Sequence, residues 1–211
     1  DIHGCIAALD RVLEEINPQP DDTLVVLGDY VDRGPDSRGV IDRLIELGRR
    51  TRLIGILGNH EQMMLDVIHH GEPHHAWLRY GGLETLESYG FDGDLDFLPE
   101  THERFFASLG DYFETDEYFF VHAAYDASVP LDQQETEMLR WYSLTQGAPG
   151  PHLSGKIAVV GHTANPAGEI VDLGHLLCID TCCYGGGWLT AMDLGTRQAW
   201  QASREGELRG S

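Results

Sequence analysis

Four short runs of apolar, mostly β-branched residues recur along this chain, and each run ends in a cluster of Gly, Asp, Asn or His. The runs cover residues 24–27, 53–57, 118–121 and 157–160, and the clusters that follow are Gly28-Asp29, Gly58-Asn59-His60, His122 and Gly161-His162. Continuous apolar runs bounded by glycine are typical of strands buried on both faces of a sheet. Ligands of an α/β fold gather where its strands end, so the clusters predict one functional site at that edge.

The segments between these runs predict the rest of the architecture. Leu, Ile and Val recur at helical spacing over residues 5–16 and 36–49, which gives the strand, loop, helix rhythm of an α/β fold. Residues 66–117 have helical patches but no obvious strand, so we interpret them as a cap inserted over one edge of the sheet. Residues 176–202 alternate in polarity and predict antiparallel strands joined by glycine turns. We expect residues 1–211 to form a single domain.

The chain opens on a fifth polar cluster, Asp1-Ile2-His3-Gly4, which leads into a predicted helix. Every other cluster of this kind follows a strand, and this one does not. We therefore expect a strand, and hence further residues, to precede Asp1.

Charge and composition exclude several classes of partner. The chain carries 35 Asp and Glu against 14 Lys and Arg, a formal net charge of −21. Such a field repels phosphate backbones, so general binding to nucleic acid or to an anionic membrane is not expected. The apolar runs are far shorter than the ~18–20 residues that span a bilayer. The four cysteines contain no CxxC pair, which is typical of reduced thiols, and we expect a cytoplasmic monomer.

The polar clusters together offer the ligands of a metal centre. If the strands are neighbours, they bring together the side chains of Asp1, His3, Asp29, Asn59, His60, His122 and His162. Such mixed nitrogen and oxygen ligands suit Mn, Fe or Zn better than calcium. The set exceeds the needs of one tetrahedral ion, which favours two divalent ions that share a bridging carboxylate. Two such ions ~3.5–4 Å apart form a clamp for in-line displacement at phosphorus.

The clusters also carry a resemblance to a known family, in the family's order. The matching segments are Asp1-Ile2-His3-Gly4, Gly28-Asp29-Tyr30-Val31-Asp32-Arg33-Gly34, Gly58-Asn59-His60-Glu61, His122-Ala123 and Gly161-His162-Thr163. They resemble the GDxHG, GDxVDRG, GNHE, H(A/G) and GH motifs of the phosphoprotein phosphatases, which are calcineurin-like metallophosphoesterases. Residues 58–64 and 81–90 look more like the bacterial and phage serine/threonine phosphatases than the eukaryotic ones. The resemblance implies a β-sandwich of two mixed sheets flanked by helices, with a small helical cap.

The resemblance also implies a set of metal ligands. These are Asp1 and His3 for one ion, Asn59, His122 and His162 for the other, and Asp29 for both. We expect two divalent ions, with Mn²⁺ supporting activity in vitro and Fe or Zn as alternatives. A hydroxide held between the ions attacks phosphorus, so no covalent intermediate is required.

Proton transfer and phosphate binding follow from the same resemblance. His60 protonates the leaving alkoxide, and Asp32 bonds the far ring nitrogen to fix its tautomer and charge. Arg33 and Asn59 bind the phosphoryl oxygens. The family places a second phosphate-binding arginine shortly after a tryptophan, whereas here Arg140 directly precedes it. Arg140 takes that role only if the register has shifted.

Several of these residues also have an ordinary structural interpretation. Asp32-Arg33 pairs are usually surface ion pairs, and Asp1 or Asp29 could cap a helix. Neither interpretation explains the histidines or the order of the motifs. Other histidines are expected to form a solvated patch on the cap: His69, His70, His74 and His75.

The sequence therefore predicts a phosphomonoesterase that acts on phosphoserine and phosphothreonine of proteins, and on phosphotyrosine or small phosphoesters to some extent. The same motifs serve symmetrical diadenosine tetraphosphate hydrolases and other nucleotide phosphohydrolases, and this alternative stays open. Residues 66–117 lack the basic cluster that a polyphosphate chain would need, which favours monoesters. A non-catalytic metal-binding scaffold is disfavoured because His60, Asp32 and Arg33 are all intact.

Overall fold

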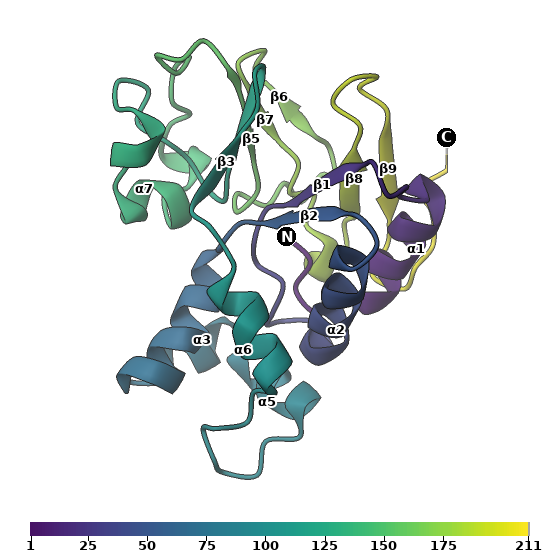
Figure 1. Ribbon diagram of the computed structural model, residues 1–211, viewed down its shortest axis with the longest axis vertical. Coiled ribbons are helices and arrows are strands. Elements are labelled where there is room, and N and C mark those ends of the chain that lie inside the picture. The colour runs from purple at the N-terminus through teal and green to yellow at the C-terminus, as the bar shows by residue number, and fades with distance from the viewer. Residues whose placement is uncertain (211) are drawn as a thin grey trace.

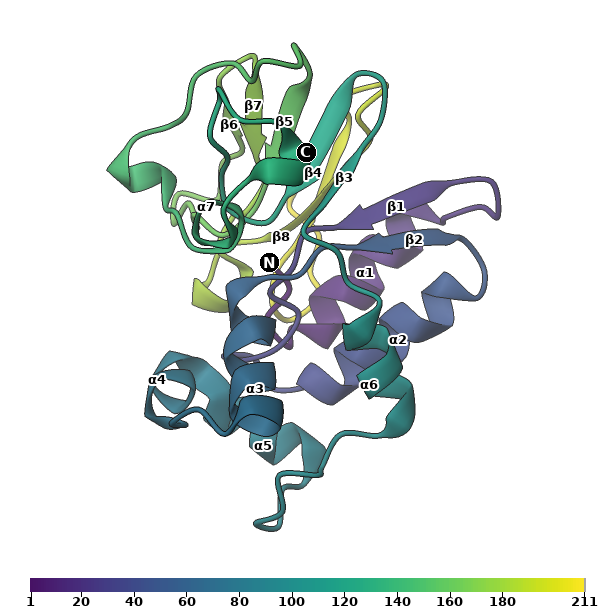
Figure 2. The same cartoon turned by 60° about the vertical axis from the view of Figure 1, so that its left-hand side comes forward.

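Two layers of strands face each other in the centre of the molecule, and helices cover the outer side of each layer (Figures 1 and 2). The computed structural model describes residues 1–210. One layer is a five-stranded mixed sheet, in which β4, β5 and β7 are parallel and the edge strands β3 and β6 are antiparallel to their neighbours. In spatial order its strands are β3 (Tyr112–Glu114), β4 (Tyr118–Val121), β5 (Ile157–Val160), β7 (Leu176–Cys178) and β6 (Val171–Asp172).

The other layer consists of two separate strand pairs. β1 (Thr23–Val26) and β2 (Arg52–Gly55) are parallel, whereas β8 (Leu189–Met192) and β9 (Ala199–Ala202) are antiparallel. Residues of β1 and β8 line a largely apolar cleft of about 450 Å³, which Asp1 and Ile2 also border. The predicted two-sheet sandwich is confirmed. The burial expected for its first two strands is wrong, because most residues of β1, beside this cleft, and of β2 are only half-buried.

The helices lie mainly outside the layer that contains β1 and β2. α1 (Ile6–Ile16) and α2 (Ser37–Gly48) confirm the predicted amphipathic segments, and they bury one face each against the strands. α3 (Asn59–His70) begins within the polar cluster that follows β2. The remaining helices of the cap region are α4 (His75–Trp77), a π-helical turn (Leu78–Gly82), α5 (Leu83–Tyr89) and α6 (Glu100–Ala107). α7 (Thr136–Arg140) lies on the far side of the five-stranded sheet (Figure 1).

Two expectations about strands are corrected. The region assigned to the cap contains β3, which pairs with β4 and stacks Phe113 on Phe120 with ring centroids 5.9 Å apart. Three residues are too few for an alternating pattern to reveal such a strand. The expected antiparallel series over residues 176–202 holds for β8 and β9, whereas β7 joins the other sheet, parallel to β5.

The apolar cores explain why the strand ends meet. Leu27, Ile56 and Phe120 pack together with Val159 and Leu177 between the two layers, so the strands that precede the polar clusters are fixed against one another. A larger core lies between the helices and the β1–β2 layer. Within residues 1–210, no helix has the length and hydropathy needed to cross a bilayer.

Candidate active site

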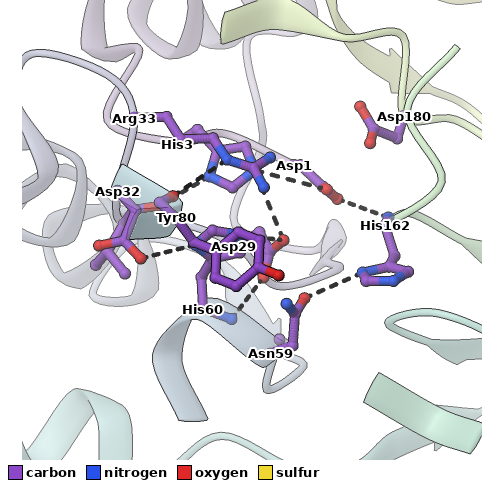
Figure 3. A network of polar contacts seen from close by, with 12 residues as sticks. Asp1, His3, Asp29, Asp32, Arg33, Asn59, His60, Tyr80, His162 and Asp180 are labelled. Carbon is purple, nitrogen blue, oxygen red and sulfur yellow. Dashed lines mark hydrogen bonds and ion pairs between the residues drawn. The ribbon is translucent and has the colours of Figure 1, made fainter. Parts of the chain in front are cut away.

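The polar clusters converge at the ends of β1, β2, β4 and β5, next to the first residues of the chain (Figure 3). The structure brings nine of the ten predicted site residues together: Asp1, His3, Asp29, Asp32, Arg33, Asn59, His60, His122 and His162. Arg140 is engaged elsewhere, as described below.

Asp29 lies between two groups of possible metal ligands. Its Oδ2 is 3.6 Å from His3 Nε2, whereas its Oδ1 is 3.4 Å from His122 Nε2. Asp1 Oδ2 lies 3.8 Å from His3 Nε2 in the first group. Asn59 Oδ1 lies 3.0 Å from ring nitrogens of both histidines of the second group, His122 and His162. Asp29 therefore occupies the position that a bridging carboxylate requires.

The histidine tautomers fit metal binding. His3 Nδ1–H donates to Val31 O at 2.9 Å, and His122 Nδ1–H donates to Leu27 O at 2.7 Å. His162 Nε2–H donates to a backbone carbonyl at 3.1 Å in the same way. Each carbonyl fixes a tautomer whose other nitrogen carries a lone pair toward Asp29, as in histidines that bind metals. Lone pairs of nitrogen and oxygen repel each other at these distances, and a cation between them would turn repulsion into binding.

The protonation states of these histidines and of Asp29 also fit metal binding. Burial is the main cause that lowers the pKa of His3, and it lowers that of His162 to about 4. Burial alone would raise the pKa of Asp29, but His122, His60 and His3 outweigh it, and the pKa lies well below its usual value. Neutral imidazoles and an ionised carboxylate are the states that coordinate a divalent cation.

Several residues of the site have strained backbone conformations. Among residues 1–210, eight non-glycine residues have positive φ, and five of them are His3, Asp29, Asp32, Arg33 and His162. Such conformations are unfavourable for residues other than glycine and persist where surrounding contacts enforce them. The glycine of the β2 cluster has a steric reason, because a Cβ at Gly58 would lie 2.3 Å from Asp29 Oδ1.

Glu61 holds two of the loops together. Its buried carboxylate accepts hydrogen bonds from the backbone N–H groups of Asp29, Tyr30, Val31 and Gly58 at 2.7–3.2 Å. Burial, followed by the charge of Asp29, raises its pKa to about 7. Glu61 lies in the first turn of α3 and fixes the Asp29 loop against the helix that carries His60.

His60 and Asp32 form a buried pair beside the Asp29 cluster. His60 Nδ1 lies 2.7 Å from Asp32 Oδ2, and both side chains are almost inaccessible to water. Burial lowers the pKa of His60, but Asp29 and Asp32 outweigh it and leave the pKa above its usual value. Burial raises the pKa of Asp32, and its hydrogen bonds offset part of that rise.

Two residues of the cap complete this pair, and sequence reasoning missed their role. Trp77 Nε1 donates to both oxygens of Asp32 at 3.0 and 3.1 Å, and Thr85 Oγ1 donates to Asp32 Oδ1 at 2.6 Å. Trp77 is buried, and it also orients the carboxylate that orients His60. Because Trp77 lies 45 positions from Asp32 in the sequence, no local motif reveals the contact.

Arg33 lies beside His3, between Tyr80 and Tyr184. Its Nε donates to Tyr80 O at 3.4 Å, and its guanidinium lies 4.4 Å from the ring centroid of Tyr184. The Tyr184 ring also contacts His3 edge-on, with centroids 4.9 Å apart. Tyr184 lies beyond the last recognisable motif, so the sequence gives no signal for this contact.

Arg140 does not reach this cluster with a free guanidinium. It forms an ion pair with Asp111, and its Nη1 donates to Gln62 Oε1 at 3.2 Å. Gln62 lies on α3, two positions after His60, and also accepts from Trp141 Nε1 at 3.1 Å. Arg140 therefore braces α3, and its phosphate-binding role stays a prediction.

Comparison with known proteins agrees with this geometry. The sequence family described as calcineurin-like phosphoesterase matches residues 1–192. The chain belongs to the calcineurin-like phosphoesterase family. The family predicted from the five motifs is thus confirmed.

Individual relatives of this calcineurin-like phosphoesterase differ in their names. Serine/threonine-protein phosphatase 1 of Salmonella typhimurium is 42% identical over 83 residues, 39% of this chain and 36% of the relative. The symmetrical bis(5'-nucleosyl)-tetraphosphatase of an Acidovorax species is 48% identical over 66 residues, 31% of this chain and 23% of the relative. The chain therefore spans well under two thirds of these relatives. A solved structure provisionally named a diadenosine tetraphosphatase shares the fold, with a TM-score of 0.71 and 23% identity over 96% of this chain and 90% of that chain.

The residues of this site are suited to different steps of phosphoester chemistry. Two divalent ions bound around Asp29 would supply an activated water nucleophile and offset the charge of the phosphoryl group. The guanidinium of Arg33 carries the charge and the N–H donors that phosphoryl oxygens require. His60 Nε2 faces Asp29 at 3.9 Å, so a proton on that nitrogen points into the site, where a leaving oxygen needs one.

Proposed function

We propose that this chain is a metal-dependent phosphomonoesterase that removes phosphate from phosphoserine and phosphothreonine of proteins. The observation that carries the proposal is the His60–Asp32 pair, buried and held by Trp77 and Thr85. The alkoxide that leaves phosphoserine is a strong base, so its departure depends on a positioned acid. Release of a nucleoside phosphate, a far weaker base, depends on one much less.

The cations near the site also favour a single phosphoryl group. Arg33 lies beside the metal ligands, within hydrogen-bond distance of His3. Arg140 is neutralised by Asp111. A polyphosphate chain carries one or more charges on each phosphate and is usually bound by several cationic groups. The relative named serine/threonine-protein phosphatase 1 supports the same substrate class.

Symmetrical hydrolysis of diadenosine tetraphosphate is the second candidate. The relative named bis(5'-nucleosyl)-tetraphosphatase supports it. Tyr80 favours it as well, because the residue is 50% exposed and its ring meets that of His60 edge-on, with centroids 6.4 Å apart. An exposed aromatic ring beside the reacting group could stack on an adenine base.

A direct comparison of substrates tests the proposal. The protein is stripped of metal, supplied with Mn²⁺, and assayed for kcat/KM on a phosphothreonine peptide and on diadenosine tetraphosphate. Preference for the peptide is the expected result. Preference for the dinucleotide would overturn the substrate but keep the metal ligands and the acid. The variant Asp29→Asn is the control, since it should lose activity on both substrates.

A further inference from the structure

Asp180 is a buried carboxylate that no motif of the family assigns. It follows β7 and is only 2% exposed. Its Oδ1 accepts a hydrogen bond from Cys182 N at 3.0 Å, which starts the turn toward Tyr184. Within residues 1–210, its Oδ2 is the buried side-chain nitrogen or oxygen that has no hydrogen-bond partner.

The unpaired Oδ2 of Asp180 lies in the same part of the molecule as the proposed metal ligands. Figure 3 shows the carboxylate of Asp180 on the side of the site where Asp1 and His162 lie. Asp1 Oδ1 accepts a hydrogen bond from His162 N at 3.0 Å, so these two residues are neighbours. The backbone carbonyl of Asp180 accepts a hydrogen bond from Asn165 N at 3.0 Å, three positions after His162, which ties its turn to the His162 loop.

Burial of an unpaired carboxylate oxygen is energetically unfavourable, and nearby negative charges make it more so. Desolvation of such a group without a partner is strongly unfavourable, and native proteins rarely leave one without an ion or a donor. Asp1 and Asp29 add two more negative charges to the same region. Divalent ions held by those two carboxylates would attract Asp180 instead. Two such ions carry four positive charges, which exceed the two negative charges of Asp1 and Asp29.

We propose that Asp180 is an outer-sphere residue of the metal centre, whose Oδ2 accepts a hydrogen bond from a cation-bound water beside Asp1 and His162. This rests on the metal dependence of the proposed function, and not on its substrate. Outer-sphere partners of this kind typically change metal affinity by ~10- to 100-fold. Asp180 is therefore a positioning residue, since it acts on the bound cations through water.

The alternative is that Asp180 only builds its turn. That role needs Oδ1 alone, because Cys182 N is bonded to Oδ1. The chain offers a matched control at Asp193, whose Oδ1 accepts from Gly195 N and Thr196 N at 2.8 and 2.9 Å in an exposed turn. The same Asp→Asn change there removes the same charge and keeps the same kind of turn.

Calorimetric titration of the metal-stripped protein with Mn²⁺ tests the proposal. Asp180→Asn keeps an oxygen for Cys182 N and should weaken Mn²⁺ binding ~10- to 100-fold, whereas Asp193→Asn should bind as the wild type does. Unchanged affinity in Asp180→Asn would overturn the role. If that variant fails to fold, Asp180→Glu decides, because it restores the charge and should bind Mn²⁺ within a few-fold of the wild type.

The outcome is separate from that of the substrate assay. Weak binding in Asp180→Asn supports the proposal whichever substrate is preferred. A wild-type protein that binds no Mn²⁺, by contrast, would overturn the metal dependence and this inference together.

Discussion

The proposed reaction depends on one side chain, His60, to protonate the leaving group. Burial lowers the pKa of His60, but Asp29 and Asp32 outweigh it and raise the pKa above its usual value, which favours the protonated ring. We expect His60→Ala to lower turnover of a phosphothreonine peptide by ~10²–10⁴-fold. An aryl phosphate with an acidic phenol leaves without help, so its turnover should fall far less. Steady-state kinetics on both substrates measures the difference, and an equal loss would count against His60 as the acid.

His162 predicts how the metal-free protein responds to acid. Its pKa lies at about 4 in the fold, below the usual 6.5, because burial and then His122 oppose its protonation. The unfolded chain therefore binds this proton at higher pH than the folded chain. As the pH falls from 6.5 toward 4, protonation of His162 in the unfolded chain lowers the free energy of unfolding. The shift corresponds to roughly 3 kcal/mol.

Urea unfolding in the presence of a chelator checks this at pH 7 and pH 4.5. His162→Asn removes the group, so its stability should fall less between the two pH values than that of the wild type. Equal losses in the two proteins would show that the imidazole is not held neutral by the fold.

The segment assigned to the cap contributes structural contacts to the candidate active site. The turn Leu78–Gly82 contacts Arg33 through backbone, because Arg33 N donates to Gly81 O at 3.1 Å. Gly81 has φ +107°, and a Cβ there would lie 2.6 Å from Arg33 N. We expect Gly81→Ala to displace Arg33 and to raise KM for phosphoesters by ~10-fold or more, since one charge-assisted contact is worth ~1.5–3 kcal/mol.

Gly93 is the matched control for that change. Its φ of +110° is nearly the same, but a Cβ there meets no atom within 4 Å. Gly93→Ala should therefore show the backbone strain alone, with lower stability and unchanged KM. Similar KM values in both variants would mean that the turn does not hold Arg33.

Elements differ in how far the sequence could predict them. α1 and α2 were predictable because their apolar residues repeat over three turns, and the Asp29 and Asn59 clusters because glycine and polar residues follow a strand. β3 and β6 were not, since two or three residues carry no period. The contact of Trp77 with Asp32 depends on how the cap folds back, which no local pattern encodes.

The whole molecule places the site where its two layers meet. Asp1, Asp29 and Asn59 come from the part built on β1, β2 and α1 to α3, whereas His122 and His162 follow strands of the five-stranded sheet. The two-sheet arrangement could be predicted from the motifs. The cleft between β1 and β8 could not, because it depends on which strand edges stay unpaired.

Metal binding should therefore stabilise the molecule as a unit. Ions bound around Asp29 would join ligands from both layers, and a ligand that binds only the folded state stabilises it by about 2.7 kcal/mol at 100 times its Kd. We expect Mn²⁺ to raise the unfolding midpoint of the metal-stripped protein, in a single transition. Asp29→Asn should remove the rise, because Asp29 belongs to both groups of candidate metal ligands within residues 1–210. A rise of the same size in Asp29→Asn would place the cation elsewhere, and two separate transitions would mean that the layers unfold independently.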